Sequence, residues 1–428
     1  MLPEKFLIGA ATAAHQVEGN NIHSDYWAME HMEHTSFAEP SLDAVDHYNR
    51  YEDDIKLLAS AGLNAYRFSI EWARIEPLEG IYEKNEIEHY RRVIRCCREN
   101  GVTPIVTLMH FTSPKWLISK GGWEAESTIE DFARYCGYVV SELGDELEYI
   151  CTINEANMGL QLAAITKRYI RQMLMPKKKE KTKKDTAQVG INMGSMIKNM
   201  KYAKAENVEI FGTKSPQTFV SQRTEKGDIL VMRAHQAAKK AIKAIHPEIK
   251  VGLSLSLHDI QAGADAEKRA AEEWDEEFLH YLPYIKDDDF LGVQNYTRTL
   301  MGRRGPLPNP EGAEVTQMGY EFYPEALANV IRKVHEVFPG DLIVTENGIA
   351  TADDTRRVEF IRRAFAGVEK CLDDGIPVKG YMYWSLLDNF EWQKGFSMTF
   401  GLVAVDRSTQ TRFPKESLKV LGSMRANR

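Results

Sequence analysis

The sequence predicts an α/β protein that folds as a single (β/α)8 TIM barrel with long βα loops. Eight short apolar, β-branched or aromatic runs follow one another along its 428 residues. Stretches in which apolar residues recur with helical spacing separate most of these runs. Strands that alternate with helices form parallel sheets, and eight such units close into a barrel. We therefore expect residues 1–428 to form one catalytic barrel domain.

Each expected strand is a short run that lacks the length of a helix. These strands cover residues 6–12, 63–69, 103–109, 149–154, 250–256, 290–295, 342–345 and 379–384. The expected helices cover residues 46–61, 85–100, 129–143, 226–245, 325–338 and 355–374. Gly62, Gly101 and Gly375 directly follow three of these helices, which is typical of a helix end. A doubly wound sheet would need a nucleotide-type glycine turn after its first strand, and Ala13-Ala14-His15-Gln16 stands there instead.

The composition disfavours several classes of partner. Lys and Arg number 54 against 62 Asp and Glu, a net charge of −8, and no motif of a known nucleic-acid fold is present, so we expect no nucleic-acid partner. No run approaches the roughly 18 apolar residues of a membrane-spanning helix, so we expect no membrane partner. The Lys-rich residues 177–184 are expected to form a solvated insertion on the barrel rim. The sequence indicates no particular oligomeric state.

Cysteine usage points to a cytoplasmic location. The five cysteines are an odd number and none lies in a C-x-x-C pair, which argues against disulfides and a structural zinc site. Motifs for nucleotide phosphates and for a serine nucleophile are also missing from the sequence. We therefore predict an enzyme without a metal or a cofactor.

Carboxylates, amides and tryptophans gather at the ends of the expected strands, where barrel enzymes carry their reactive groups. Glu155 and Glu346 directly follow the fourth and seventh runs. Across a barrel mouth, two such acids can act on opposite sides of one bond. Trp384 and Trp392 suit stacking on the apolar face of a sugar ring. The other polar residues at these ends are Gln16, Glu18, Arg67, Glu71, His110, Asn154, His258, Tyr296, Asn347, Asp388 and Glu391.

Five motifs in order along the chain carry a resemblance to a known family. They are Gln16-Val17-Glu18-Gly19, Tyr66-Arg67-Phe68-Ser69-Ile70-Glu71-Trp72, Thr152-Ile153-Asn154-Glu155, Val344-Thr345-Glu346-Asn347-Gly348, and the stretch from Trp384 to Trp392 followed by Phe400-Gly401-Leu402. Over about residues 6–413 the sequence resembles the β-glucosidases of glycoside hydrolase family 1.

The resemblance implies a retaining β-glycosidase, with a β-glucosidase as the first choice, acting on small-molecule or oligosaccharide β-glycosides. It implies that Glu346 is the nucleophile and Glu155 the acid that becomes a base in the second step. Arg67 would favour the charged form of Glu346, and Asn154 would hold the sugar's 2-hydroxyl. The remaining implied sugar-binding residues are Gln16, His110, Tyr296, Trp384, Glu391 and Trp392.

The sequence departs from the family pattern at three places. Phe111-Thr112-Ser113-Pro114 replaces the usual Trp-Asp-Leu-Pro, Gln294-Asn295-Tyr296 replaces Asn-Tyr-Tyr, and Ala156 replaces the proline after the acid. Three alternatives stay open. A 6-phospho-β-glycosidase would place phosphate against Glu391, a non-catalytic sugar-binding barrel would have lost one acid, and a thioglucosidase-like enzyme would dispense with Glu155.

Overall fold

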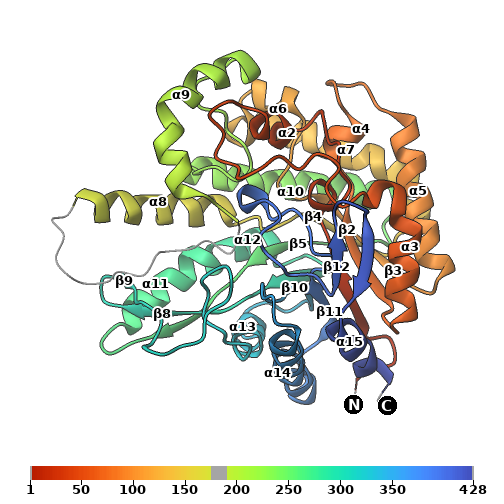
Figure 1. Cartoon of the computed structure of the whole chain (residues 1–428), viewed down its shortest axis with the longest axis vertical. Helices are drawn as coiled ribbons and strands as arrows, with labels where there is room; N and C mark the ends of the chain where they lie inside the picture. Colours follow the sequence, from red (N-terminus) through yellow and green to blue (C-terminus); the bar gives the residue numbers. More distant parts are fainter. Residues whose placement is uncertain (1, 175–189, 427–428) are drawn as a thin grey trace.

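A computed structural model describes residues 2–174 and 190–426, and the Lys-rich residues 177–184 lie outside these ranges. Parallel strands close into a barrel in the order β1-β11-β10-β7-β5-β4-β3-β2 (Figure 1). The barrel strands are β1 Leu7–Ala11, β2 Ala65–Ser69, β3 Thr103–Met109, β4 Tyr149–Ile153, β5 Lys250–Ser256, β7 Phe290–Gln294, β10 Asp341–Asn347 and β11 Val378–Trp384. Each corresponds to one expected run, so the predicted fold class is confirmed.

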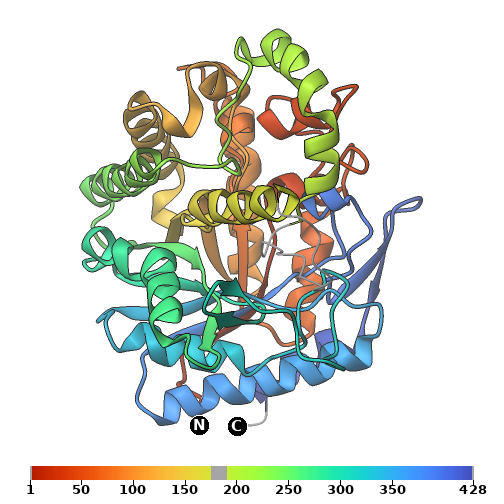
Figure 2. The same ribbon diagram turned by 90° about the vertical axis from the view of Figure 1, so that its left-hand side faces the viewer.

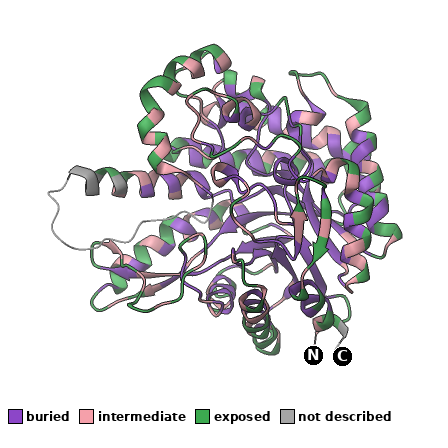
Figure 3. Ribbon diagram, in the orientation of Figure 1, coloured by how far each residue is buried: buried purple, intermediate pink, exposed green. Residues whose placement is uncertain are grey.

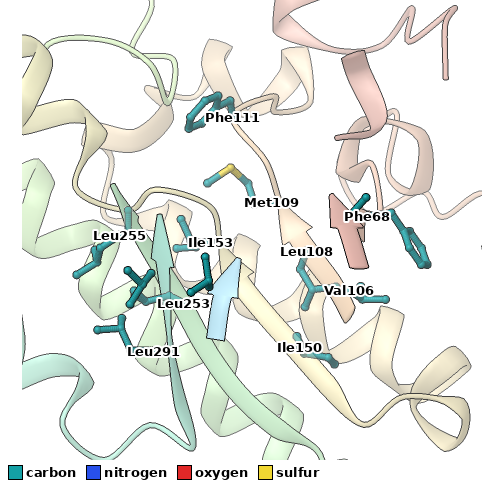
Figure 4. Close-up of a cluster of buried hydrophobic side chains, with 14 of the residues drawn as sticks. Phe68, Val106, Leu108, Met109, Phe111, Ile150, Ile153, Leu253, Leu255 and Leu291 are labelled. Atoms are coloured by element: carbon teal, nitrogen blue, oxygen red, sulfur yellow. The ribbon is translucent and has the colours of Figure 1, made fainter. Parts of the chain in front are cut away.

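The barrel strands are apolar over nearly their whole length because both of their faces are buried. Figure 3 shows the strands buried at the centre and the exposed residues on the outward faces of the surrounding helices. Side chains from β2, β3, β4, β5 and β7 form one continuous cluster (Figure 4). The labelled members of this cluster are Phe68, Val106, Leu108, Met109, Phe111, Ile150, Ile153, Leu253, Leu255 and Leu291.

The expected helices surround the barrel. They are α3 His47–Ser60, α5 Lys84–Glu99, α7 Ser127–Leu143, α10 Glu225–Ile245, α13 Ala326–His335 and α14 Asp354–Asp373. Side-chain caps fix two of the starts, since the Thr224 hydroxyl accepts from the backbone N–H of Gly227 and the Asp353 carboxylate from that of Thr355. The expected helix at residues 325–338 was too long, because α13 ends at His335.

The connections after the strands hold elements that the periodicity did not predict. The helices among them are α1 Ala14–Val17, α2 Asp25–Glu30, α4 Trp72–Ile75, α6 Lys115–Ser119, α8 Met158–Leu174, α9 Met193–Phe211, α11 Glu267–Glu277, α12 Leu282–Ile285 and α15 Glu416–Ala426. The added strands are β6 Asp259–Ala262, β8 Arg298–Gly302 and β9 Gly305–Pro306 in one small sheet, and β12 Val403–Asp406 with β13 Thr411–Pro414 in another. The 3-10 turns span Gly122–Glu124, Gly144–Glu146, Leu279–Tyr281 and Trp392–Lys394.

Helices α8 and α11 and the small sheet of β6, β8 and β9 lie on the same side of the barrel, and Figure 2 shows this side facing the viewer. None of the helices in the two described ranges is long and apolar enough to cross a bilayer. All five cysteines are buried and unpaired. A cytoplasmic location stays a prediction.

Candidate active site

The predicted site residues lie at the carboxyl ends of the barrel strands. Gln16 belongs to α1, the first turn after β1, and Arg67 lies on β2. His110 follows β3, Asn154 and Glu155 follow β4, and Tyr296 comes two residues after β7. The remaining site residues come from the last two barrel strands. Glu346 lies in β10, Trp384 ends β11, and Glu391 and Trp392 lie in the loop after β11.

Glu346 is held by two strong donors. The Arg67 guanidinium donates from Nη1 to Oε1 over 2.6 Å, and the Tyr296 hydroxyl donates to Oε2 over 2.5 Å. All three side chains are buried. Burial raises the pKa of the Glu346 carboxyl, while Arg67 and Tyr296 oppose that rise by stabilising its ionised form. These contacts fix the carboxylate's position and favour its charge.

Glu155 has a different environment. Its backbone N–H donates to the Ser254 hydroxyl over 3.1 Å, and its φ of 44° lies in the left-handed region, which is strained for a glutamate. Its Oε2 atom is buried without a hydrogen-bond partner among the described residues. Burial, followed by the charge of Glu346, raises the pKa of Glu155 well above its usual range. Glu155 therefore keeps its proton while Glu346 has the stronger support for ionisation.

Asn154, the residue before Glu155, forms hydrogen bonds with side chains of β2, β5 and β7. Its Oδ1 accepts from Arg67 Nη2 at 2.6 Å, from Gln294 Nε2 at 2.8 Å and from the Ser254 hydroxyl at 3.2 Å. Its Nδ2 lies 3.1 Å from His110 Nε2, so the amide presents its nitrogen side to the imidazole. Sequence reasoning missed the roles of Gln294 and Ser254 in holding Asn154. Both lie on expected strands, and Gln294 stood out only as part of a departure from the family pattern.

Aromatic side chains surround His110. Its ring stacks near Trp384 and Trp392, with centroids 5.7 and 5.9 Å apart. The ring of His15 stacks on Trp392 at an interplanar angle of 2°. Sequence reasoning did not select His15. Phe111, which departs from the family pattern, also contacts Trp392, with centroids 5.2 Å apart. Burial and Arg67 lower the pKa of His110 far below its usual range, so its imidazole is neutral.

Glu391 directly precedes Trp392 in the chain. The Gln16 amide donates to its Oε2 over 3.4 Å and to the carbonyl of Phe390 over 2.7 Å. Burial, with a smaller contribution from Glu346, raises the pKa of Glu391 to about 8. Trp384 and the backbone of Gly190 also hydrogen-bond this carboxyl and oppose the rise. Glu391 therefore keeps its proton to a higher pH than an ordinary carboxyl group does.

Four acids and amides from the expected strand ends have structural contacts instead. Glu18 binds Arg74 over 2.8 Å. Glu71 accepts from the Thr112 hydroxyl over 2.7 Å, and Asp388 binds Lys415 over 2.8 Å. The Asn347 amide donates to the carbonyl of Asn295. These contacts hold the loops around the site.

Comparison with known proteins identifies the family. A sequence model described as glycosyl hydrolase family 1 matches residues 1–428. The β-glucosidase A of Thermotoga maritima is 30% identical over 97% of this chain and 95% of its own length. A bifunctional β-D-glucosidase/β-D-fucosidase of Bifidobacterium breve is 28% identical over 97% of this chain and 96% of its own length. A β-glycosidase of known crystal structure superposes with a TM-score of 0.87 at 45% identity, covering 99% of this chain and 96% of its own. The chain belongs to glycosyl hydrolase family 1 and is a retaining β-glycosidase.

Proposed function

We propose that this protein is a β-glucosidase that hydrolyses terminal non-reducing β-D-glucosyl residues, with Glu346 as nucleophile and Glu155 as acid and base. One observation carries this assignment. Glu346 accepts short hydrogen bonds from both Arg67 and Tyr296, whereas burial and Glu346 together raise the pKa of Glu155. Two carboxyl groups whose environments separate their protonation states are what double displacement requires.

In the first step, the ionised Glu346 attacks the anomeric carbon while Glu155 gives its proton to the departing glycosidic oxygen. The C–O bond to the leaving group breaks as the ester bond to Glu346 forms. Arg67 and Tyr296 keep the attacking carboxylate aligned, because each holds a different oxygen of it.

In the second step, Glu155 acts as the base. Once Glu346 is esterified, its negative charge is gone, and so is one cause of the raised pKa of Glu155. Glu155 then accepts a proton from a water molecule that attacks the anomeric carbon. The ester bond breaks, and Glu346 leaves as a carboxylate with the sugar released in its original anomeric form.

Unpartnered buried atoms support a sugar in the pocket. The Gln16 Oε1, His110 Nδ1 and Glu155 Oε2 atoms are buried and have no hydrogen-bond partner among the described residues. Such atoms are costly unless a ligand or water satisfies them. Sugar hydroxyls would satisfy Gln16 and His110, while the glycosidic oxygen would accept from Glu155. The stacked indoles of Trp384 and Trp392 supply the apolar surface that a sugar ring needs.

The 6-phospho-β-glycosidase alternative is less favoured because the described hydrogen-bond partners of Glu391 include no cation that would bind phosphate. Repulsion between Glu391 and phosphate is the weaker argument. Since the pKa of Glu391 is about 8, its repulsion of phosphate at pH 7 is weaker than that of an ionised carboxylate. Its described hydrogen-bond partners are Gln16, Trp384 and Gly190, and this group contains no Lys or Arg that would bind phosphate.

A panel of chromogenic glycosides and a stereochemical assay test the proposal. We expect the β-glucoside to have the highest kcat/KM among β-glucoside, β-galactoside, β-fucoside, β-mannoside, 6-phospho-β-glucoside and α-glucoside. Proton NMR of the first-formed sugar, with a chelator present, should show the β-anomer before mutarotation. The α-anomer in first place would contradict double displacement, and faster turnover of the 6-phosphoglucoside would contradict the assignment of the sugar.

A further inference from the structure

A cavity of about 880 Å³ is lined in part by α8, the helix that follows Glu155 in the chain. It is lined by α8, α11 and the small sheet of β6, β8 and β9, the elements on the side that Figure 2 faces. Thr297, which directly follows Tyr296, and Tyr320 line the cavity as well. Its wall combines charged residues such as Lys167 and Glu273 with apolar residues such as Ile165. The cavity therefore suits a ligand that has both hydroxyl groups and an apolar face, as a sugar does.

Hydrogen bonds connect this cavity to Glu155. The Ser256 hydroxyl donates to the Glu155 carboxyl, and Ser256 ends β5. Asn157, two residues after Glu155, donates from Nδ2 to the carbonyls of Ser256 at 2.8 Å and Glu277 at 3.0 Å. Gln161 repeats the pattern, donating to the Ser256 carbonyl and to Glu277 Oε1. One hydrogen-bond network therefore includes both Glu155 and Glu277.

His258 belongs to the same hydrogen-bond network. It comes two residues after Ser256 and lines the cavity, with 17% of its side chain exposed. Its Nδ1 lies 2.5 Å from Glu277 Oε1, which also accepts from the His258 backbone N–H at 3.1 Å. Because a carboxylate accepts there, Nδ1 carries the ring proton. The Nε2 atom has no hydrogen-bond partner in the described part of the chain, and in the neutral ring it is an acceptor.

We propose that His258, oriented by Glu277, determines leaving-group specificity by accepting a hydrogen bond from a hydroxyl of a sugar leaving group in this cavity. The proposal rests on the function proposed above, because the catalytic acid of a glycosidase faces the leaving-group oxygen. The cavity that these hydrogen bonds connect to Glu155 is then where we place the leaving group. A sugar leaving group gains the bond to Nε2, whereas a nitrophenyl group has no hydroxyl to donate.

Two substitutions at His258 separate this role from a structural one. In His258→Asn the side-chain amide lies where Nδ1 was, so it keeps the bond to Glu277 and removes the atom facing the cavity. In His258→Gln the amide reaches the position of Nε2 and gives up the bond to Glu277. The first variant should lose the preference for sugar leaving groups, and the second should retain most of it.

The assay compares kcat/KM for cellobiose with kcat/KM for 4-nitrophenyl β-glucoside, two substrates that share the same glucosyl unit. We expect His258→Asn to lower this ratio about five- to ten-fold, as for the loss of one buried hydrogen bond. Transfer of the glucosyl unit to added cellobiose, measured as the ratio of trisaccharide formed to nitrophenol released, should fall as well. Both ratios are independent of the folded fraction, because each compares activities of the same enzyme molecules.

His280→Asn is the matched control. His280 also lies against a carboxylate, with Nε2 3.1 Å from Asp228 Oδ2, but it does not line the cavity. This variant should leave both ratios unchanged. An unchanged ratio in His258→Asn, or normal behaviour of His258→Asn with an impaired His258→Gln, would overturn the proposal. Wild-type enzyme that hydrolyses no β-glucoside would instead overturn the proposed function, on which this inference rests.

Discussion

Replacing Tyr296 by phenylalanine should shift the pH dependence of the enzyme by a calculable amount. The Tyr296 hydroxyl is one of two groups that donate to the Glu346 carboxylate, at 2.5 Å, with Arg67 at 2.6 Å as the other. A hydrogen bond to a charged group contributes about 1.5–3 kcal/mol, and one pKa unit corresponds to about 1.36 kcal/mol. Its loss should therefore raise the pKa of Glu346 by about one to two units.

The sign of the effect follows from the role of the carboxylate. Glu346 must be ionised to attack, so activity is lost on the acid side as Glu346 gains a proton. A higher pKa moves this acid limb to higher pH. At a pH below both limbs the Tyr296→Phe enzyme should be roughly ten- to a hundred-fold less active than wild type, while above both limbs the difference should be much smaller.

The assay is kcat/KM for 2,4-dinitrophenyl β-glucoside as a function of pH, because this leaving group needs little protonation by Glu155. Tyr135→Phe is a suitable control. Its hydroxyl is also buried, but it donates to the carbonyls of Ile70 and Leu108 and contacts no acid of the site. An acid limb that stays in place, with activity lowered equally at every pH, would refute the assigned function of Tyr296.

Three further predictions concern the acids. Glu346→Ala should abolish turnover of every substrate, whereas Glu155→Ala should spare 2,4-dinitrophenyl β-glucoside relative to cellobiose; equal losses on the two substrates would contradict the separate roles. Glu391→Ala should lower kcat/KM for glucosides more than for fucosides, which lack the 6-hydroxyl, by about 1–3 kcal/mol; a uniform loss would show that Glu391 only supports its loop. Because burial raises the pKa of Glu391 from 4.5 to about 8, the unfolded chain loses this proton first, so its contribution to the free energy of unfolding falls as pH rises through that interval. Chemical denaturation of Glu391→Gln should show a flatter pH dependence there, and a slope equal to that of wild type would contradict the shifted pKa.

The barrel was predictable because its strands are buried on both faces and therefore read as continuous apolar runs. The run at residues 103–109 coincides with β3, and that at 250–256 with β5. The elements in the loops gave no such signal. Strand β9, Gly305–Pro306, is too short to show alternation, and it forms through its pairing with β8. Pairing between distant segments is a tertiary effect that local spacing does not encode.

The candidate site was predictable as a set of strand ends but not in its contacts. Both Glu71 and Glu346 stand at such ends, yet Glu71 contacts Thr112 and only Glu346 contacts Arg67. Residue type could not separate them, because the difference lies in which side chains the closed barrel brings together. Residue type could not predict the pKa of Glu391 either. Its rise to about 8 results first from burial and then from the charge of Glu346.

Closure of the barrel also sets the order in which the enzyme is completed during its synthesis. Strand β1 pairs with β2 on one side and with β11 on the other, where Ala11 lies opposite Trp384. At about 5–20 residues per second, the ribosome makes the second partner roughly 20 to 75 seconds after the first strand. Until then one edge of β1 stays open to other chains. The segment that closes this edge ends in Trp384, so a nascent chain acquires the indole that we propose stacks on the sugar only as the exposed edge disappears.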